Sequence, residues 1–263
     1  MHVAVAATAP FGADVLERLA SRRPIEYLLT RPDRPRGRGQ KLEPTAAKRV
    51  AERLNIPVRQ PERLDGSFEV DADAVVVVAY GALVPEALLD DALWLNVHPS
   101  LLPRWRGAAP VERALMAGDR ETGVTVHRTT AELDAGPIAA QERFEIAADD
   151  DAGTVYAKSA ELAVPMLERV LERPQFVPQP EDGVTYAEKL TPADRELDLS
   201  RPPEELVNRV RALSPHIGAR AELHGRNLIL WRARIKDGRF EPVEVQPEGG
   251  RRMTYAEFLR GLR

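Results

Sequence analysis

The chain has 263 residues and no cysteine, so it contains no disulfide and no thiolate that could bind a metal or act as a nucleophile. Its five histidines are scattered and lack the i, i+4 spacing of a zinc-binding helix, so we predict no metal site. No apolar run approaches the roughly 18 residues that a membrane-spanning helix requires. The N-terminal residues also lack the basic start and long apolar core of a signal peptide. We therefore predict a cytoplasmic protein without a membrane partner.

The charge of the chain is unevenly distributed. The net charge is −4, but residues 201–263 carry 13 Lys and Arg against 8 Asp and Glu. A second basic cluster consists of Arg31, Arg34, Arg36, Arg38 and Lys41, with only Asp33 as an acid between its ends. Local clusters, rather than the total, set the electrostatic field that a polyanion meets. The two clusters fit nucleic-acid binding and, from charge alone, fit a solvated arginine-rich surface equally well.

Strand and helix patterns alternate through the first part of the chain. The clearest strand is 74–80, because four consecutive valines fit a strand that is covered on both faces. The other predicted elements are strands at 2–7, 25–30 and 93–97 and helices at 13–21 and 44–54. This alternation predicts an α/β fold with a Rossmann-like open, mostly parallel sheet and helices on both faces. Ligands bind outside the carboxyl ends of such strands, so we expect the chemistry in the loops after Tyr80 and Val97.

The rest of the chain predicts further sheet, a long helix, a linker and a small C-terminal domain. Two strands are predicted at 122–130 and 138–146, and a helix at 153–171. Residues 173–200 are rich in proline and charge, which indicates an extended linker between a domain at 1–172 and a domain at 201–263. In the second domain we predict helices at 202–213 and 254–262 and strands at 220–223, 227–235 and 242–247.

Residues 96–110, NVHPSLLPRWRGAAP, combine reactive polar groups with a stiff backbone. Asn96 and His98 are two residues apart at the end of a predicted strand, so both side chains point to the same face. An amide and an imidazole at the carboxyl edge of a sheet can stabilise an oxyanion and move a proton. Taken alone the pair is a weak signal, because a histidine at a strand end is more often only hydrogen-bonded.

This segment resembles the signature of the formyltransferases that use 10-formyltetrahydrofolate, in which Asn-x-His is followed by Ser-Leu-Leu-Pro and a glycine. Residues 104–110, RWRGAAP, are most similar to the methionyl-tRNA branch of that family. Similar stretches occur at 30–48, 75–89, 117–138 and 185–200, so the resemblance covers nearly the whole chain. It implies a catalytic domain at 1–172 and transfer of a formyl group from 10-formyltetrahydrofolate to the amino group of initiator methionyl-tRNA.

The resemblance also assigns roles to particular residues. The Asn, His and Asp of the family fall on Asn96, His98 and Asp134. Asn96 would donate to the oxyanion, and His98, held by Asp134 directly or through water, would take part in proton transfer. Asp134 could otherwise cap an ordinary turn. The implied folate site is made by Tyr80, Gly81, Leu83, Val84, Ser100, Leu101, Leu102 and Pro103. For the first four of these residues, packing after a buried strand is the alternative.

The basic cluster near residue 35 corresponds to an insertion that contacts tRNA in the methionyl-tRNA branch. Prolines and glycines between residues 32 and 39 disfavour a helix or a strand, so we predict an extended loop. Arginines on such a loop suit phosphate and base contacts. The implied tRNA-binding residues are Arg34, Arg36, Arg38 and Lys41, and Arg38 falls at the key arginine of the family.

Two segments depart from the family pattern. Residues 7–12, ATAPFG, stand where the family usually has Gly-Thr-Pro-x-Phe-Ala. In the C-terminal domain a short bridge, KDGRFEP, replaces the middle strands of the family's barrel. Three strand candidates therefore stand where an OB-type barrel has five. We predict a small, truncated OB-like β-barrel with an exposed edge.

Two alternative functions use the same residues. A sugar-nucleotide or other small-amine N-formyltransferase would share Asn96, His98 and Asp134, so these residues do not separate the two activities. The basic loop favours tRNA as the acceptor, whereas the shortened barrel favours a small substrate. A folate- or tRNA-binding protein without catalysis is the other alternative, and the intact set of three residues argues against it. We expect a monomer.

Overall fold

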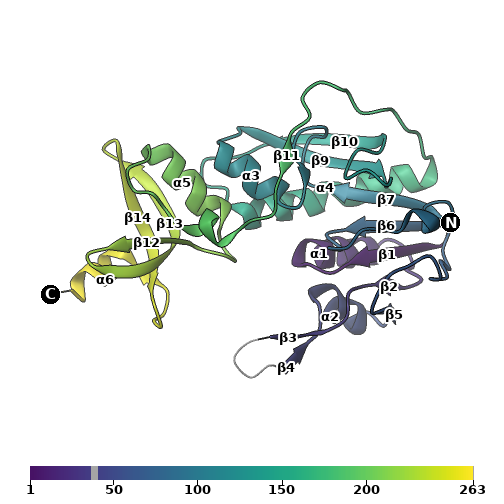
Figure 1. The fold of residues 1–263 in the computed structure, drawn as a ribbon, viewed down its shortest axis with the longest axis horizontal. Coiled ribbons are helices and arrows are strands. Elements are labelled where there is room, and N and C mark those ends of the chain that lie inside the picture. Colours follow the sequence, from purple (N-terminus) through teal and green to yellow (C-terminus); the bar gives the residue numbers. More distant parts are fainter. Residues whose placement is uncertain (37–40, 263) are drawn as a thin grey trace. The chain divides into compact units, whose positions relative to one another are not determined.

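The computed structural model describes residues 1–36 and 41–262 (Figure 1). The chain divides into two compact units. The N-terminal unit comprises Met1–Arg106, Gly123–Arg143 and Ala157–Thr185, and the C-terminal unit comprises Gly107–Thr122, Phe144–Tyr156 and Tyr186–Arg263. Each unit thus combines segments that are far apart in the sequence. The division of the sequence at 1–172, 173–200 and 201–263 stays a prediction.

The N-terminal unit is built on a mostly parallel sheet. Among the described residues this sheet has seven strands in the order β10-β9-β7-β6-β1-β2-β5. The pairs from β7 to β5 are parallel, and β9 is antiparallel to β7. The strands are β1 (Val3–Ala7), β2 (Leu28–Leu29), β5 (Val58–Arg59), β6 (Ala74–Val78), β7 (Leu93–His98), β9 (Glu121–Arg128) and β10 (Ile138–Glu145). The predicted α/β fold with an open, mostly parallel sheet is confirmed.

Burial explains why the central segments are strands. Every residue of β1 and of β6 is buried, as expected of strands that are covered on both faces. On one face, alternate residues of these strands pack with Trp94 against Leu64, Phe68 and Leu89. The Nε1 atom of Trp94 donates to the carbonyl oxygen of Leu88 at 2.7 Å, which satisfies its polar group inside the core.

The departure from the family pattern at residues 7–12 forms a tight strand-to-helix turn. Helix α1 (Pro10–Ala20) begins with Pro10 in its first turn, where no N–H is needed. A Cβ at Gly12 would lie 2.4 Å from the carbonyl oxygen of Val78, so only glycine lets α1 come this close to the end of β6. The other helices that include residues of this unit are α2 (Ala46–Arg53), η1 (Glu86–Leu88) and α4 (Ala152–Glu172).

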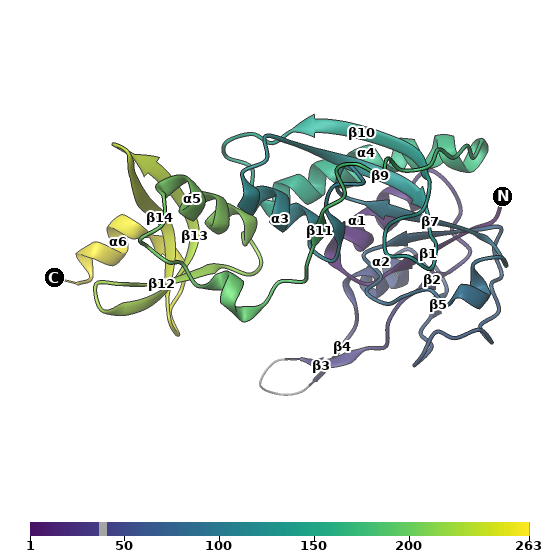
Figure 2. The same cartoon turned by 45° about the horizontal axis from the view of Figure 1, so that its top comes forward.

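The basic segment near residue 35 forms a short hairpin, which corrects the prediction of a loop without strands. β3 (Arg34–Arg36) pairs antiparallel with β4 (Lys41–Glu43), and Pro35 lies opposite Leu42. Proline is tolerated because each strand of a two-stranded hairpin has a free edge, at which a missing N–H removes no ladder bond. Figures 1 and 2 show the hairpin extending away from the sheet of its unit. Arg38 lies outside the described residues.

The C-terminal unit contains an antiparallel sheet. Its described residues form four strands in the order β12-β13-β14-β15. The strands are β12 (Ala219–Leu223), β13 (Arg226–Lys236), β14 (Arg239–Pro247) and β15 (Met253–Thr254). The three predicted strands are confirmed as β12, β13 and β14. Asp237 and Gly238, with φ of 50° and 70°, turn β13 directly into β14, so the bridge KDGRFEP is largely a tight hairpin turn.

Two apolar clusters stabilise the C-terminal unit. In one, Val210 and Leu213 at the end of α5 (Pro203–Ala212) pack on Leu230 and Val245 of the sheet. In the other, α3 (Pro110–Ala117) packs through apolar side chains onto Ala212. The remaining elements of the described chain are β8 (Arg106–Gly107), β11 (Tyr186–Ala187), η2 (Pro192–Arg195) and α6 (Tyr255–Arg260). Helix α5 therefore contributes to both clusters.

An ion pair attaches the segment before α5 to α3 within the same unit. The Nη1 atom of Arg113 lies 2.7 Å from Oδ1 of Asp194, and the two side chains are 21% and 16% exposed. The backbone N–H of Thr191 also donates to the Asp194 carboxylate at 2.7 Å. The hydrogen bond from Arg113, assisted by the bonds from Thr191, lowers the pKa of Asp194 to about 2.

We expect Asp194→Asn to lower the free energy of unfolding by about 2 kcal/mol at pH 7. The folded pKa lies below the unfolded one, so this contribution is present above about pH 4 and is lost as the pH falls through about 2. Unfolding measured from pH 7 down to pH 3 should show a shrinking difference between the variant and the parent. The exposed Asp182→Asn is the control. A difference that is constant across this range would contradict the assignment.

Candidate active site at the carboxyl end of β7

Asn96 and His98 lie on β7, between the parallel strand β6 and the antiparallel strand β9. The register places Asn96 beside Val77 of β6 and opposite His127 of β9, and places His98 opposite Thr125. Residues directly opposite each other in an antiparallel pair point to the same face. The sheet therefore brings one amide and two imidazoles together near the carboxyl end of β7.

Asp134 reaches this cluster from the loop between β9 and β10. Its Oδ1 atom accepts a hydrogen bond from Nδ2 of Asn96 at 2.9 Å, and its side chain is 9% exposed. Its backbone has φ of 48°, in the left-handed region that few L-residues adopt. A Cβ at Gly136 would lie 1.8 Å from the carbonyl oxygen of Arg128, so the tight closure of this loop requires glycine.

His98 lies between Asp134 and a backbone carbonyl. Its Nε2 atom donates to the carbonyl oxygen of Trp105 at 2.8 Å, because that oxygen can only accept. Its Nδ1 atom lies 3.6 Å from Oδ2 of Asp134, beyond direct hydrogen-bond distance. Burial lowers the pKa of His98, and the Asp134 carboxylate opposes this effect. A neutral ring thus holds its proton on Nε2 and presents Nδ1 to the carboxylate, where a second proton can be received.

His127 is part of the cluster and was missed by the sequence analysis. Its Nδ1 atom donates to the carbonyl oxygen of Arg128 at 3.0 Å, so Nε2 is the acceptor for Nδ2 of Asn96 at 3.2 Å. The same Nε2 atom lies 3.5 Å from Oδ1 of Asp134. The Asn96 amide nitrogen therefore points one hydrogen at Asp134 and the other at His127. Only the pairing register of β7 with β9 could have revealed this contact.

The loop after β7 is braced from within the unit. Ser100 is fully buried, and its hydroxyl donates to the carbonyl oxygen of Arg104 at 2.7 Å. The carbonyl oxygen of Ser100 accepts from Thr125, and the carbonyl oxygen of Leu102 accepts from Gln141 at 3.0 Å. Leu101 and Pro103 are half-buried. In this arrangement Ser100 supports the loop, and its hydroxyl is directed inward.

The loop after β6 lies at the same edge of the sheet, because β6 and β7 are parallel neighbours. The side chain of Tyr80 is buried in the core, so this residue can offer only its backbone to a ligand. The carbonyl oxygen of Gly81 accepts from Nη1 of Arg31 at 2.9 Å. Leu83 is 76% exposed, and Val84 is half-buried against the core. The structure therefore brings both predicted folate loops to one edge, with an exposed leucine on one of them.

Three of the four predicted tRNA-binding residues lie on β3 and β4 and not in the Asn96 cluster, and Arg38 lies outside the described residues. Arg34 and Arg36 are on β3, and Lys41 is on β4. The side chain of Arg34 is exposed to solvent. Among the described residues, no group of three or more His, Asp or Glu is placed to hold a metal ion. No helix in the described part of the chain is long and apolar enough to cross a membrane.

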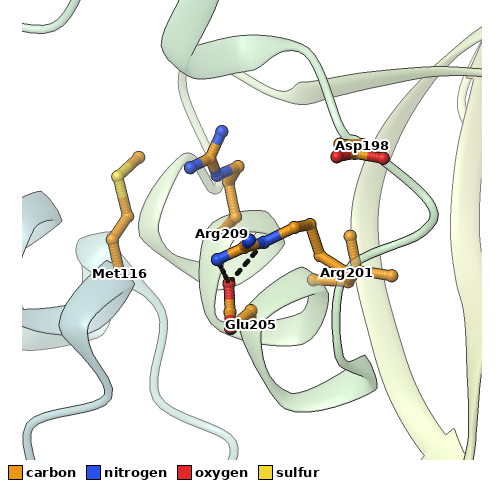
Figure 3. Close-up of a pocket in the computed structure, with 6 residues that line it drawn as sticks. Met116, Asp198, Arg201, Glu205 and Arg209 are labelled. Atoms are coloured by element: carbon orange, nitrogen blue, oxygen red, sulfur yellow. Dashed lines mark hydrogen bonds and ion pairs between the residues drawn. The ribbon is translucent and has the colours of Figure 1, made fainter.

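Two of the cavities in the described part of the chain lie outside the Asn96 cluster. One, of about 530 Å³, is in the N-terminal unit beside the Asp134 loop, and its lining includes Arg106, Glu132, Ala135 and Gln179. The other, of about 320 Å³, is in the C-terminal unit (Figure 3). It is lined by Met116, Asp198, Arg201, Glu205, Leu206 and Arg209. Arg201 and Glu205 form an ion pair at 2.8 Å, and the two arginines balance the two carboxylates. We assign no ligand to this second cavity.

The fold and the site define a class of enzyme. An amide, two imidazoles and a carboxylate meet at the carboxyl edge of an α/β sheet, and the buried Ser100 hydroxyl is directed away as a brace. Such a set can stabilise charge on a carbonyl oxygen and move protons, which is the chemistry of group transfer at a carbonyl carbon.

Comparison with known proteins gives the family. Residues 1–171 match the formyl transferase family, and residues 189–243 match the C-terminal domain of formyl transferases. The methionyl-tRNA formyltransferase of Paracoccus denitrificans is 39% identical over 291 residues, which cover 100% of this chain and 98% of the relative. That of Chromobacterium violaceum is 39% identical and covers 99% of this chain and 96% of the relative. The chain belongs to the formyl transferase family, in its methionyl-tRNA formyltransferase branch.

Solved structures share the fold at low sequence identity. A methionyl-tRNA formyltransferase from Clostridium thermocellum superposes with a TM-score of 0.68 and 14% identity, covering 94% of this chain and 98% of that one. HypX from Aquifex aeolicus, solved in complex with tetrahydrofolic acid, gives a TM-score of 0.66 and 17% identity over 98% of this chain and 47% of its own. The aligned length of 291 residues exceeds the 263 residues of this chain, so the Paracoccus relative contains segments that this chain lacks.

Proposed function

We propose that this chain transfers the formyl group of 10-formyltetrahydrofolate to the amino group of initiator methionyl-tRNA, giving N-formylmethionyl-tRNA and tetrahydrofolate. The observation that carries the proposal is the Asn96–His98–Asp134 cluster at the carboxyl end of β7, in a chain that matches methionyl-tRNA formyltransferases over its whole length. Separate observations support the catalytic residues, the folate site and the tRNA contact.

The reaction makes two demands on the site. The neutral amine attacks the formyl carbon, a C–N bond forms, and the carbonyl oxygen becomes an oxyanion. The bond from that carbon to N10 of the folate then breaks, and N10 leaves with a proton that the amine has lost. The site must therefore stabilise the oxyanion and move one proton from the attacking nitrogen to the leaving one.

Asn96, His98 and Asp134 meet these demands. The hydrogen of Asn96 that now points to His127 can turn to the oxyanion, while the other stays with Asp134. The Nδ1 atom of His98 faces the Asp134 carboxylate across 3.6 Å, so the two groups can hold the transferred proton between them. The imidazolium formed in this way would be stabilised by Asp134 on one side and by the Trp105 carbonyl on the other.

The folate site is proposed at the edge formed by the loops after β6 and β7. The exposed Leu83 and half-buried Val84 offer apolar surface, and Gly81 is exposed to solvent. Leu101, Leu102 and Pro103 follow β7 on the braced loop, with Ser100 and Thr125 fixing its shape. A flat, partly apolar heterocycle with polar edges suits a site of apolar side chains and backbone groups.

The tRNA contact is proposed at the β3–β4 hairpin, through Arg34, Arg36, Arg38 and Lys41. Arg38→Ala should weaken binding of tRNA and make its salt dependence shallower by about one unit of log–log slope, because one phosphate contact is lost. The affinity for folate should be unchanged. Binding titrations at several salt concentrations test this, with the exposed Arg173→Ala as the control. An altered folate affinity without a change in tRNA binding would contradict the assignment.

The acceptor is tested by a formylation assay with purified protein and 10-formyltetrahydrofolate. Charged initiator tRNA should be formylated with a far higher kcat/KM than an amino-sugar nucleotide or a simple amine. A preference for the sugar nucleotide would favour the small-amine alternative. Binding of both ligands without turnover would favour the non-catalytic alternative. The cytoplasmic location and the monomer stay predictions, and size-exclusion chromatography tests the second.

A further inference from the structure

One side chain outside the predicted site fixes the backbone of the Asp134 loop. Gln179 lies in the segment after α4, 45 residues from Asp134. Its Nε2 atom donates to the carbonyl oxygen of Asp134 at 2.7 Å and to that of Gly136 at 2.8 Å. Its Oε1 atom accepts from Nε and Nη2 of Arg106 at 3.2 and 2.8 Å. Both hydrogens of the Gln179 amide nitrogen are thus donated to the loop that carries Asp134.

The same segment also fixes the other partner of His98. The hydroxyl of Thr185 accepts from the backbone N–H of Trp105 at 2.9 Å, and the carbonyl oxygen of Thr185 accepts from the N–H of Arg106 at 2.9 Å. Trp105 carries the carbonyl that accepts from His98. Residues 179–185 therefore contact both sides of the imidazole pocket, through Gln179 on the Asp134 side and Thr185 on the Trp105 side.

Both backbone sites that this segment holds are conformationally costly. Asp134 has φ of 48° and Trp105 has φ of 63°, in the left-handed region that is unfavourable for residues with a Cβ. Such conformations persist only where surrounding bonds fix them. Val177, two residues before Gln179, exchanges two backbone hydrogen bonds with Ile138, at 2.8 and 2.9 Å, and so anchors this part of the chain to the first residue of β10.

We propose that residues 179–185 form a positioning strap, in which Gln179 and Thr185 hold Asp134 and the Trp105 carbonyl at the distances that His98 requires. The proposal rests on the proposed function for its effect on turnover. Neither residue touches the reacting atoms, so each acts through His98 and its two partners. Arg106, which is 8% exposed, supports Gln179 by filling both lone pairs of its Oε1 atom.

The test compares Gln179→Ala with Gln175→Ala, since Gln175 is an exposed glutamine four residues before Gln179 and outside the strap. Gln179→Ala should lower kcat for formylation by about 10- to 100-fold, because small displacements of catalytic groups have effects of that size. The KM for folate should match that of the control. Gln179→Glu should be as impaired as Gln179→Ala, since it keeps an acceptor for Arg106 but loses both donors to the loop. Parent-like kcat in Gln179→Glu would overturn the proposal.

A double-mutant cycle separates positioning from general support of the fold. In an Asp134→Asn background, Gln179→Ala should cost less than about threefold, because residues that act as a unit are not additive. Thr185→Val, which keeps the shape but removes the acceptor for Trp105, should also lower kcat and leave folate binding unchanged. Fully additive losses in the cycle would show that Gln179 acts on the fold and not through Asp134, and would overturn the proposal.

A measurement that does not depend on turnover distinguishes a failure of this proposal from a failure of the proposed function. The imidazole nitrogen signals of His98 in NMR, assigned with His98→Asn, should shift in Gln179→Ala and stay in place in Gln175→Ala. Unchanged His98 signals in Gln179→Ala would overturn the positioning role whichever acceptor the enzyme uses. A parent protein that fails to formylate methionyl-tRNA would overturn the proposed function, and the NMR comparison would still decide the role of Gln179.

Discussion

Asp134→Asn is expected to lower kcat by roughly 10³-fold or more, since replacing a buried aspartate that orients a catalytic histidine has effects on the order of 10⁴. The carboxylate accepts from Asn96 at 2.9 Å and faces Nδ1 of His98 at 3.6 Å. An asparagine keeps the size of the side chain but removes the charge that stabilises an imidazolium. It can also turn an N–H toward Nδ1, which would block the atom that receives the proton.

The substitution should change kcat and leave ground-state binding of folate intact, because Asp134 is not among the predicted folate contacts. It should also lower the pKa of His98 further, since burial already lowers it and the carboxylate is the main opposing influence. Steady-state kinetics and an NMR titration of His98 measure the two effects. The exposed Asp90→Asn is the matched control. A titration of His98 that is unchanged by Asp134→Asn would mean that the two groups are not coupled.

His98 and Asp134 should also behave as a unit. The double substitution His98→Asn with Asp134→Asn should cost little more than the more severe single one, because each removes the same proton-transfer step. Independent, multiplying losses would contradict a coupled pair.

Much of this site was predictable, because its geometry follows from strand periodicity. Asn96 and His98 share a face of β7 since side chains alternate along a strand. The run of four valines predicted β6, and parallel neighbours bring their carboxyl ends to one edge. The role of Asp134 was predicted only from the resemblance of its segment to the family. Nothing in a Leu-Asp-Ala-Gly turn predicts which strand end the aspartate will contact.

The parts that the sequence did not predict depend on long-range pairing. His127 reaches Asn96 only because β9 pairs antiparallel with β7 in one register. Gln179 lies in a proline-rich segment without periodicity, and its role depends on two backbone carbonyls that carry no sequence signal. The β3–β4 hairpin was missed because its prolines and glycines are typical of loops, and two short edge strands tolerate them.

Asn96→Ala is expected to lower kcat by about 10²–10³-fold, the usual effect of removing one donor to an oxyanion. The structure adds a second consequence, because Nδ2 of Asn96 also donates to Asp134. If Asn96 only positioned Asp134, Asn96→Ala would cost almost nothing in an Asp134→Asn background. If Asn96 donates directly to the oxyanion, Asn96→Ala should lower kcat further in the Asp134→Asn background, because the developing charge then has no hydrogen-bond donor.

His127 provides the comparison that separates these roles. Its Nε2 atom accepts a hydrogen bond from Asn96 at 3.2 Å and so cannot donate one to the oxyanion. His127→Ala should therefore leave the Asn96 amide able to turn toward the substrate. We expect His127→Ala to lower kcat far less than Asn96→Ala, with folate dissociation constants equal to that of the parent in both variants. Single-turnover formylation and folate titration measure the two quantities. A loss of less than threefold in Asn96→Ala would remove Asn96 from the chemical step, and the Asp134 carboxylate would then have to act without the amide as its partner.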